Sequence, residues 1–571
     1  MIEPSFKLIW EPWLDRATTR PDDLAIVHWR LGATSVTWTA AALMAAAFDV
    51  SRRLKAAGVR RGEVCATILR HHAAFYPVYL GIVLAGAVPT VLAYPNPRLH
   101  PEKFREGIEG MLDQSGFDWI LTEEALLPLL GVIGEKAGHA FRGILHPLGW
   151  VHEPADYRLK TFCDTAVERA APNDPCLLQH SSGTTGLQKP IMLSHRSVLG
   201  HLRCYGEAVS ALPCDKVVSW LPLYHDMGLI AAFHLPLGLG IPLVQLDPFE
   251  WVQAPISLLQ AISEHRATLA WLPNFAFNLM AERVRDDELD GLRLDSMRLF
   301  VNCSERVKAS SHDRFAERFA KIGLNPEALG ASYAMAEATF AVTQTTPGIR
   351  APVCYVDRQE IAASRVVVLA ADNSAAIPCV SSGKLVKGCE IRIVDDGDDN
   401  LPAERIGHLL VRSPSLFDGY RNHQEKTREA MIDSWYRTGD IGFRVEDEFF
   451  VIGRSKDVII VAGKNIYPED IETVVNGVDG VLPGRSVAFG VESATSGTEE
   501  IWIVAETGLT DESEIKALRH RILKASLQVD VTVSRVSLVP PRWLYKTSSG
   551  KPCRHTNRER VMAEPKQRVP G

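Results

Sequence analysis

A run of small and hydroxylated residues, Ser181 to Gly186, is the stretch of this 571-residue chain best suited to binding an anion. It follows the apolar run 176–178, which predicts a buried strand. Glycines let backbone N–H groups approach a ligand, and the hydroxyls add donors, so a phosphate group is the expected ligand. It is not a Walker A loop, because Lys189 is followed by Pro190 and not by a Mg²⁺-binding hydroxyl. A flexible turn without a ligand is the alternative.

The overall composition is that of an ordinary globular protein, with 46% hydrophobic and 23% charged residues. The length predicts at least two domains. The net charge of −7 disfavours nucleic acid as a partner, since phosphate backbones select basic surfaces. No apolar window approaches the about 18 residues of a membrane span, and no export signal is visible. The ten scattered cysteines predict free thiols, no zinc site and a cytoplasmic location.

The elements that must position the loop predict an α/β fold. From residue 23 to about residue 250, short apolar runs alternate with helical patterns, which is typical of a largely buried sheet covered by helices. Helices are predicted at 39–57, 73–87 and 229–239. Strands are predicted at 64–69, 88–92, 119–122, 217–221, 242–246, 269–272 and 299–302.

The last part of the chain has a different pattern and predicts a smaller domain. Strands are expected near 486–489, 500–506 and 536–539, with a helix at 512–527. About a hundred residues of this kind suffice for a separate core. We therefore expect a large, subdivided N-terminal domain, 1–455, and a small α+β domain, 456–571, with the boundary at Lys456.

Five further segments follow the loop in a fixed order. They are Leu221–Leu229, Gly330–Thr339, Trp435–Ile441, Gly453–Gly463 and Lys546–Lys551. The series resembles the adenylate-forming superfamily of acyl-CoA synthetases, nonribosomal peptide synthetase adenylation domains and luciferases, over nearly the whole chain. Within it the chain looks most like a fatty acyl-AMP ligase. The resemblance implies that the small domain is a mobile lid with its hinge at Lys456.

One feature of that branch is extra length after the Glu337 segment. The residues from Thr346 to Val380, with a strand-like run at 365–369, resemble the insertion that distinguishes ligases feeding carrier proteins from CoA ligases. A surface hairpin without a role is the alternative, because loop insertions are well tolerated.

The resemblance implies a two-step reaction. The carboxylate of a medium or long-chain fatty acid joins the α-phosphate of ATP, and pyrophosphate leaves. The acyl group then passes to the phosphopantetheine thiol of an acyl carrier protein, expected in trans because no carrier domain follows Lys551. A fatty acyl-CoA synthetase is the nearest alternative. A non-catalytic acyl- or nucleotide-binding protein is disfavoured by four retained residues: Glu337, Asp440, Arg454 and Lys551.

Three residues receive catalytic roles from the resemblance. Glu337 would carry the Mg²⁺ that bridges phosphate oxygens, unless it is only a carboxylate at a helix start. Lys551 would place positive charge on the attacking carboxylate and the α-phosphate. His225 would line the acyl channel, with a structural histidine as the alternative. It is not expected to act as a base, because a carboxylate has no proton to lose at neutral pH.

A second set of residues would contact the nucleotide. Tyr333, between Ser332 and Ala334, would stack on adenine, although it could also be a core tyrosine. Asp440 would accept both ribose hydroxyls, and Arg454 would assist at the ribose or a phosphate. The β and γ phosphates would contact the loop residues Ser181, Ser182, Gly183, Thr184, Thr185 and Gly186.

The resemblance also implies an apolar wall for the acyl chain and leaves some positions open. The expected wall residues are Trp220, Phe233, Phe275 and Phe277. Residues that depart from the family pattern surround Lys189, whose role stays open, and replace family residues at Cys303, Ser304 and His408.

Overall fold

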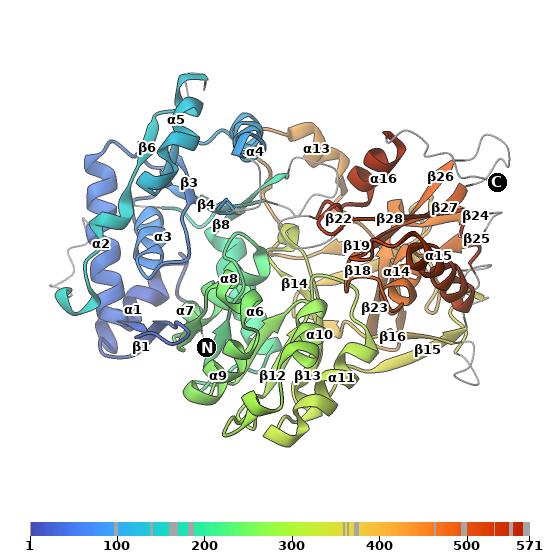
Figure 1. Cartoon of the computed structure of the whole chain (residues 1–571). Coiled ribbons are helices and arrows are strands. Elements are labelled where there is room, and N and C mark those ends of the chain that lie inside the picture. The colour runs from blue at the N-terminus through green and yellow to red at the C-terminus, as the bar shows by residue number, and fades with distance from the viewer. Residues whose placement is uncertain are drawn as a thin grey trace.

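The computed structural model describes residues 2–95, 101–136, 141–158, 170–180, 188–357, 360–361, 365–369, 376–461, 464–492, 499–529, 531–546 and 552–563. The N-terminal part forms the larger body, and the C-terminal part packs at one side of it, in red in Figure 1. The predicted α/β class, with a large N-terminal and a smaller C-terminal domain, is confirmed.

The first large sheet has seven strands in the order β20-β8-β7-β4-β3-β5-β6. The five strands from β7 to β6 pair in parallel, whereas β8 and β20 are antiparallel to their neighbours. The strands are β3 (Val64–Ile68), β4 (Val88–Val91), β5 (Trp119–Thr122), β6 (Gly143–Leu145), β7 (Pro175–His180), β8 (Pro190–Ser194) and β20 (Gly419–Tyr420). The predicted strands at 64–69, 88–92 and 119–122 are confirmed.

The second large sheet has nine strands in the order β17-β14-β13-β12-β11-β9-β10-β1-β2. Its six central strands are parallel, and the flanking strands β2, β14 and β17 are antiparallel. The strands are β1 (Leu24–His28), β2 (Val36–Thr39), β9 (Val217–Ser219), β10 (Leu243–Gln245), β11 (Leu269–Leu272), β12 (Leu299–Asn302), β13 (Leu329–Ala334), β14 (Ala341–Gln344) and β17 (Lys384–Leu385). The central strands are almost entirely buried, as parallel strands covered on both faces require.

Helices cover both sheets and fill the space between them. Every residue of α3 is buried, and the hydroxyl of Tyr79 lies 2.8 Å from Nε2 of His234, next to the second sheet. The helix α2 begins where the Thr39 side chain accepts the N–H of Ala42, and it ends before Gly58. The helices are α1 (Glu11–Thr19), α2 (Ala40–Ala56), α3 (Phe75–Leu84), α4 (Pro101–Ser115), α5 (Leu127–Lys136), α6 (His195–Ala208), α7 (Leu235–Leu239), α8 (Pro248–Gln253), α9 (Ile256–His265), α10 (Asn274–Arg283), α11 (Ala309–Phe319) and α13 (Gln424–Glu429).

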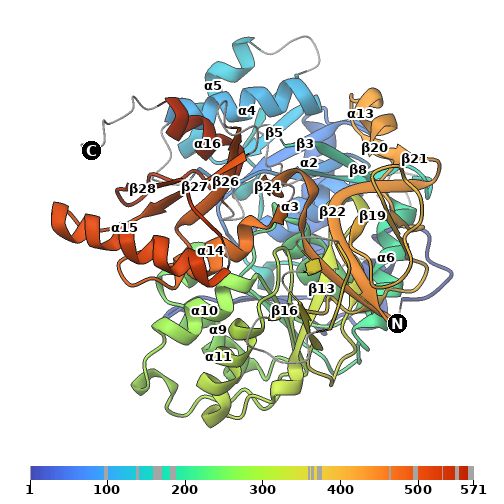
Figure 2. The ribbon, with the colours of Figure 1, turned by 90° about the vertical axis from the view of Figure 1, so that its right-hand side faces the viewer.

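A third sheet connects the large body to the small domain. It contains β18 (Glu390–Val394), β19 (Gly407–Arg412), β21 (Met431–Ile432), β22 (Trp435–Val445) and β23 (Glu448–Arg454), all antiparallel. A separate hairpin, β15 (Val353–Asp357) with β16 (Ala376–Val380), packs against β23. Both views place this hairpin beside α14 (Pro468–Asn476) of the small domain (Figures 1 and 2).

The small domain has its own core. A short turn at 455–457 leads from β23 into the pair β24 (Ile459–Val461) and β25 (Lys464–Ile466). The sheet β26 (Ser486–Glu492), β27 (Glu499–Glu506) and β28 (Arg535–Val539) then packs with α14, α15 (Glu512–Ser526) and α16 (Arg554–Ala563). The strands and the helix predicted between residues 486 and 539 are confirmed. The hinge at Lys456, inside the turn, stays a prediction.

Two predicted elements differ in detail from the structure. The helix expected at 229–239 is confirmed, but it begins as a π-helix, Met227–His234, followed by the short α7. Pro236 has no N–H to donate to a carbonyl four residues earlier, which prevents one continuous α-helix. The strand-like run at 365–369 makes only isolated bridges, Val366 to Arg405 and Val356 to Leu369.

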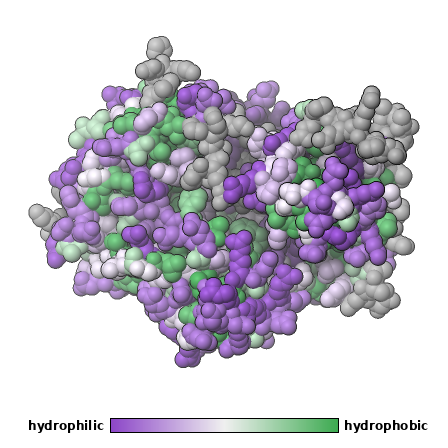
Figure 3. Space-filling view, viewed as in Figure 1, coloured by the Kyte–Doolittle hydropathy of each residue, from purple (hydrophilic) through white to green (hydrophobic). Residues whose placement is uncertain are grey.

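On the face shown in Figure 3, hydrophilic and hydrophobic side chains are interspersed. None of the helices in the described ranges is both long and apolar enough to cross a bilayer.

Six of the described histidines are buried, and burial lowers their pKa values. The pKa is about 3 for His28, His201 and His234, and about 4 for His180, His195 and His312. A ring nitrogen of His201 accepts the N–H of Ala341 at 3.3 Å, and His195 accepts that of Ile9 at 3.2 Å. These nitrogens can accept only while they carry no proton.

The protein should therefore lose stability as the pH falls below 6.5. In the unfolded chain histidine has a pKa of about 6.5, so between that pH and about 4 the unfolded state binds more protons and the free energy of unfolding decreases. Each buried histidine contributes up to about 1.4 kcal/mol per pH unit. Thermal midpoints measured from pH 7 to 4.5 should fall steeply, and His201→Gln should make the fall shallower. The exposed His520→Gln is the control, and identical slopes for both variants would contradict the prediction.

Candidate active site

The predicted phosphate loop and Lys551 lie outside the described residues, but the strands next to them are placed. Ser181, Ser182, Gly183, Thr184, Thr185 and Gly186 connect β7 to β8, which pair antiparallel with His180 opposite Pro190. The His180 ring is fixed by the hydroxyls of Thr90 at 3.1 Å and Ser115 at 2.9 Å. Lys546 and Pro552, which flank Lys551 in the sequence, form an isolated β-bridge. The pairing of β7 with β8 holds the two ends of the phosphate loop together.

Glu337 is a nearly buried carboxylate fixed by contacts from a distant segment. It lies in a helical turn directly after β13 and is 8% exposed. Its backbone carbonyl accepts the N–H of Phe417 at 2.8 Å, and its Oε1 accepts the hydroxyl of Tyr420 at 3.0 Å. The hydroxyl of Tyr436 lies 3.3 Å from that of Tyr420. Burial and the charge of Glu337 raise the pKa of Tyr420, so the phenol stays a donor.

Positive side chains gather beside this carboxylate. The Lys189 ammonium lies 4.7 Å from the ring centre of Tyr420. Burial, followed by repulsion from Arg454 and Lys189, lowers the pKa of Lys456, although Asp457 raises it. Lys456 thus lies close enough to Arg454 and to Lys189 to be repelled by both, an arrangement of cations that favours an anionic ligand. This gives Lys189, whose role the sequence left open, a place in the site.

Asp440 and Tyr333 meet across two sheets. The Tyr333 hydroxyl, from β13, donates to Oδ2 of Asp440 at 2.6 Å. Arg454, opposite Asp440 in the β22–β23 ladder, places its Nε 3.2 Å from Oδ1. Burial and the charge of Asp440 raise the pKa of Tyr333. Of its neighbours on β13, Ser332 donates to the carbonyl of Thr343 at 2.7 Å, and Ala334 is half-buried. The structure thus brings Tyr333, Asp440 and Arg454 together.

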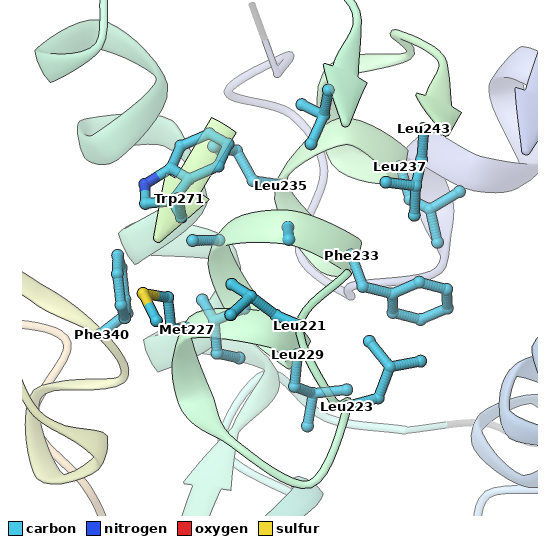
Figure 4. Close-up of a cluster of buried hydrophobic side chains, with 14 of the residues drawn as sticks. Leu221, Leu223, Met227, Leu229, Phe233, Leu235, Leu237, Leu243, Trp271 and Phe340 are labelled. Atoms are coloured by element: carbon cyan, nitrogen blue, oxygen red, sulfur yellow. The ribbon is translucent and has the colours of Figure 1, made fainter. Parts of the chain in front are cut away.

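The segment around His225 forms a tight turn into the π-helix. The rings of Tyr224 and His225 lie 4.9 Å apart, and Asp226 accepts the N–H of Met227 at 2.8 Å. Figure 4 shows Met227 inside the buried cluster, near Phe340. The Met227 sulfur also lies 3.0 Å from Sγ of Cys303. The turn that contains His225 therefore contacts, through Met227, the segment that precedes Glu305.

The four aromatic residues expected to line an acyl channel do not form one surface. Trp220 stacks on Trp251 with ring centres 3.7 Å apart, and Phe275, 39% exposed, lies 6.1 Å from Trp220. Phe233 and Phe277 are fully buried within other aromatic clusters. Only Trp220 and Phe275 contact each other.

Two residues of the site, Tyr420 and Tyr436, received no role from the sequence, although Tyr436 lies within the segment Trp435–Ile441. No spacing rule relates a tyrosine to a carboxylate 83 positions earlier in the chain. The only local signal was the Asp-Gly-Tyr sequence at 418–420, which alone predicts a turn.

Comparisons with known proteins show which family and which fold the chain shares. The family described as AMP-binding enzyme matches residues 13–421. A probable long-chain-fatty-acid–AMP ligase, FadD30, of Mycobacterium tuberculosis is 30% identical over 97% of this chain and 98% of its own length. A putative acyl-CoA synthetase of Caulobacter vibrioides is 30% identical over 88% of this chain and 86% of its own.

Among solved structures, a fatty acyl-adenylate ligase from a study of the enzymes of E. coli and L. pneumophila superposes with a TM-score of 0.87. It is 26% identical, and the match covers 98% of both chains. Large domain, connecting sheet and small domain are thus all part of the shared fold.

The start of the π-helix packs closely against the preceding turn and requires glycine at position 228. A Cβ on Gly228 would lie 2.2 Å from the carbonyl oxygen of Pro222. We expect Gly228→Ala to destabilise the protein by about 3 kcal/mol, since backbone atoms must move. The matched control is Gly238→Ala in α7, whose Cβ would meet only the side-chain ends of Ile2 and Leu202 at 3.1 and 3.2 Å. Thermal midpoints compare the two. A control as damaging as Gly228→Ala would contradict the steric argument.

Proposed function

Since the chain belongs to the AMP-binding enzyme family, we propose that it is a fatty acyl-AMP ligase serving a carrier protein. It joins a medium or long-chain fatty acid to the α-phosphate of ATP, releases pyrophosphate and transfers the acyl group to a phosphopantetheine thiol. The observation that carries the proposal is the convergence of Glu337, the Tyr333–Asp440 pair and the cations Lys189, Arg454 and Lys456 at one place.

The donor set at Glu337 fits Mg²⁺. The ion prefers carboxylate oxygens combined with substrate phosphates. The Glu337 carboxylate is nearly buried, and Tyr420 fixes Oε1 by donating to it. A hydrogen bond of this kind orients a metal ligand. Glu337 would hold the ion, which would supply positive charge that stabilises the phosphates of the nucleotide.

The chain's own residues bind and orient the nucleotide. Asp440 exchanges the hydroxyl of Tyr333 for the ribose hydroxyls, which present the same type of donor. Tyr333 then offers its ring to adenine, and Arg454 stays beside the ribose or a phosphate. The loop at 181–186 donates to the β and γ phosphates.

In the adenylation step the acid attacks the α-phosphorus and pyrophosphate leaves. Lys551 places positive charge on the attacking carboxylate and on the α-phosphate, where negative charge accumulates. His225 lines the path of the acyl chain, and no general base is required because the acid arrives ionised.

The fatty acid as substrate rests on the names of the relatives and on the exposed aromatic residue at the site. FadD30 is named for long-chain fatty acids. The exposed ring of Phe275 beside Trp220 offers an apolar surface for an alkyl chain.

The carrier protein as acceptor, acting as a separate partner, rests on the insertion. Its hairpin packs with Phe443 and Phe450 in one apolar cluster, next to the segment where Lys456 would act as the hinge. A structure at that place can hinder the rearrangement that CoA needs, which gives selectivity against the wrong acceptor. The Caulobacter relative, named as an acyl-CoA synthetase, favours CoA as the second candidate acceptor. The cysteines in the described ranges form no disulfide, which supports a reducing compartment, and we propose the cytoplasm.

Removing the carboxylate or its hydroxyl donor tests the metal site. Glu337→Gln should lower acyl-adenylate formation about 10²- to 10³-fold, the usual effect of losing one electrostatic contact to the reacting phosphate. Tyr420→Phe should instead raise the Mg²⁺ concentration needed for half-maximal rate at least about 10-fold. Pyrophosphate release measures the rates, and direct titration with Mn²⁺ and a non-hydrolysable ATP analogue measures binding.

The control for Tyr420→Phe is Tyr157→Phe, which also removes a hydroxyl that forms a hydrogen bond, here at 3.0 Å to the N–H of His152. An unchanged metal requirement in a folded Tyr420→Phe protein would contradict the orienting role.

The acceptor is tested by offering three thiols to the same preparation. Pyrophosphate release across a panel of fatty acids first identifies the acid. Acyl transfer to holo carrier protein, CoA and free phosphopantetheine is then measured, with adenylate formation as the internal control. We expect transfer to the carrier to exceed transfer to CoA at least about tenfold, equivalent to about 1.4 kcal/mol. Equal rates would replace the proposal with an acyl-CoA synthetase.

A further inference from the structure

Two cysteines of the insertion lie directly opposite each other. Cys354 on β15 pairs with Cys379 on β16 in the antiparallel register. The N–H of Ser381 donates to the carbonyl of Pro352 at 2.8 Å, so the pair two residues further along, Cys354 with Cys379, is also a hydrogen-bonded pair. The Cα atoms of such a pair lie about 5.5 Å apart. Disulfides bridge Cα atoms at about 5.5 to 6 Å.

Both thiols point to the same, inner face of the hairpin. Cys354 and Cys379 belong to one apolar cluster with Phe443 and Tyr467, whereas Tyr355, next along the strand, is 40% exposed. Cys379 is 3% exposed, and Cys354 is half-buried. The Cys354 S–H donates to the Cys379 sulfur. One thiol is therefore accessible to a small molecule, and the other lies immediately behind it.

An arginine next to the inner thiol makes it the better nucleophile. The hydrogen bond from Cys354 and the charge of Arg306 lower the pKa of Cys379, although burial raises it. Thiolates, not thiols, carry out disulfide chemistry. In the strand pairs that the structure describes, no other two cysteines stand opposite each other.

The same arginine connects the hairpin to the small domain. Nη1 of Arg306 lies 2.6 Å from Oδ1 of Asp470, on α14. Burial works against the Arg306 charge, but Asp470, Cys379 and Glu469 outweigh it and raise the pKa of Arg306. Cys379 and Asp470 therefore lie beside the same cation.

We propose that Cys354 and Cys379 form a reversible modification site, a dithiol that closes to an intrachain disulfide on exposure to a peroxide and thereby strengthens the contact between Arg306 and Asp470. The Cys379 thiolate attacks one peroxide oxygen, giving a sulfenic acid and hydroxide. The hydroxide takes the proton of the Cys354 thiol, which then attacks the Cys379 sulfur and expels the second hydroxide. The two thiols lose two electrons and two protons, and one hydrogen peroxide becomes two water molecules. A cellular dithiol reverses the step by exchange.

Oxidation of the two cysteines affects the small domain through the charge on Arg306. A Cys379 thiolate would compete with Asp470 for Arg306, whereas the disulfide has no negative charge and leaves Arg306 to Asp470 and its neighbour Glu469. Because the pair is only 15% and 20% exposed, solvent screens it weakly. Oxidation should therefore hold α14 more firmly against the large domain.

The experiment maps disulfides in the full-length protein. After treatment with hydrogen peroxide and alkylation, non-reducing peptide mass spectrometry should show Cys354 linked to Cys379, with full recovery of both thiols after dithiothreitol. Cys354→Ser should abolish the link, and so should the buried Cys379→Ser. The control Cys214→Ser, which removes an exposed single thiol, should leave the link intact. Oxidation of Cys214 while Cys354 and Cys379 both remain alkylatable would overturn the proposal.

Hydrogen exchange tests the coupling. Amides of α14 should exchange more slowly in the oxidised than in the reduced protein, and Arg306→Gln should remove the difference. Equal exchange in the two redox states of the wild-type protein would overturn the coupling. Neither readout requires turnover, so the result is independent of the proposed function.

Discussion

The site depends on two carboxylates that have lost nearly all contact with water and are solvated by the protein instead. Glu337 and Asp440 are each 8% exposed, and each accepts a hydrogen bond from a tyrosine hydroxyl. A buried carboxylate without such donors would cost several kcal/mol. The donors come from different sheets: Tyr333 from the nine-stranded sheet and Tyr420 from the seven-stranded one. Asp440 itself belongs to the third sheet, so the site exists only where all three sheets meet.

Much of the fold could be predicted from the sequence because its signals are local. Buried parallel strands appear as short apolar runs, and α2 has a threonine at its start and a glycine after its end. The π-helix at 227–234 could not be found this way, since its apolar sequence fits several helical periods. The run at 365–369 has strand composition, yet only Val366 and Leu369 form bridges. Strand propensity describes side chains that suit a sheet, and it does not supply a partner strand.

The candidate site was predictable only where a residue belongs to an ordered series of segments. Glu337, Asp440 and Arg454 lie in such segments, and the structure describes them in one region. Tyr420, the contact of Tyr436 with it and the position of Lys189 depend on long-range contacts that no local pattern encodes. The roles of Lys551 and of the loop at 181–186 stay predictions, because these residues lie outside the described part of the chain.

The distance along the chain between these partners has a consequence for biosynthesis. Tyr333 and Asp440 are 107 positions apart, and β8 gains its outer neighbour only when β20 has been made. Chains emerge from the ribosome at about 5–20 residues per second, N-terminus first. During the seconds before β22 and β23 emerge, the nascent large domain contains neither Asp440 nor Arg454. A nucleotide bound as we propose can therefore assist the folding of this protein only after most of the polypeptide has left the ribosome.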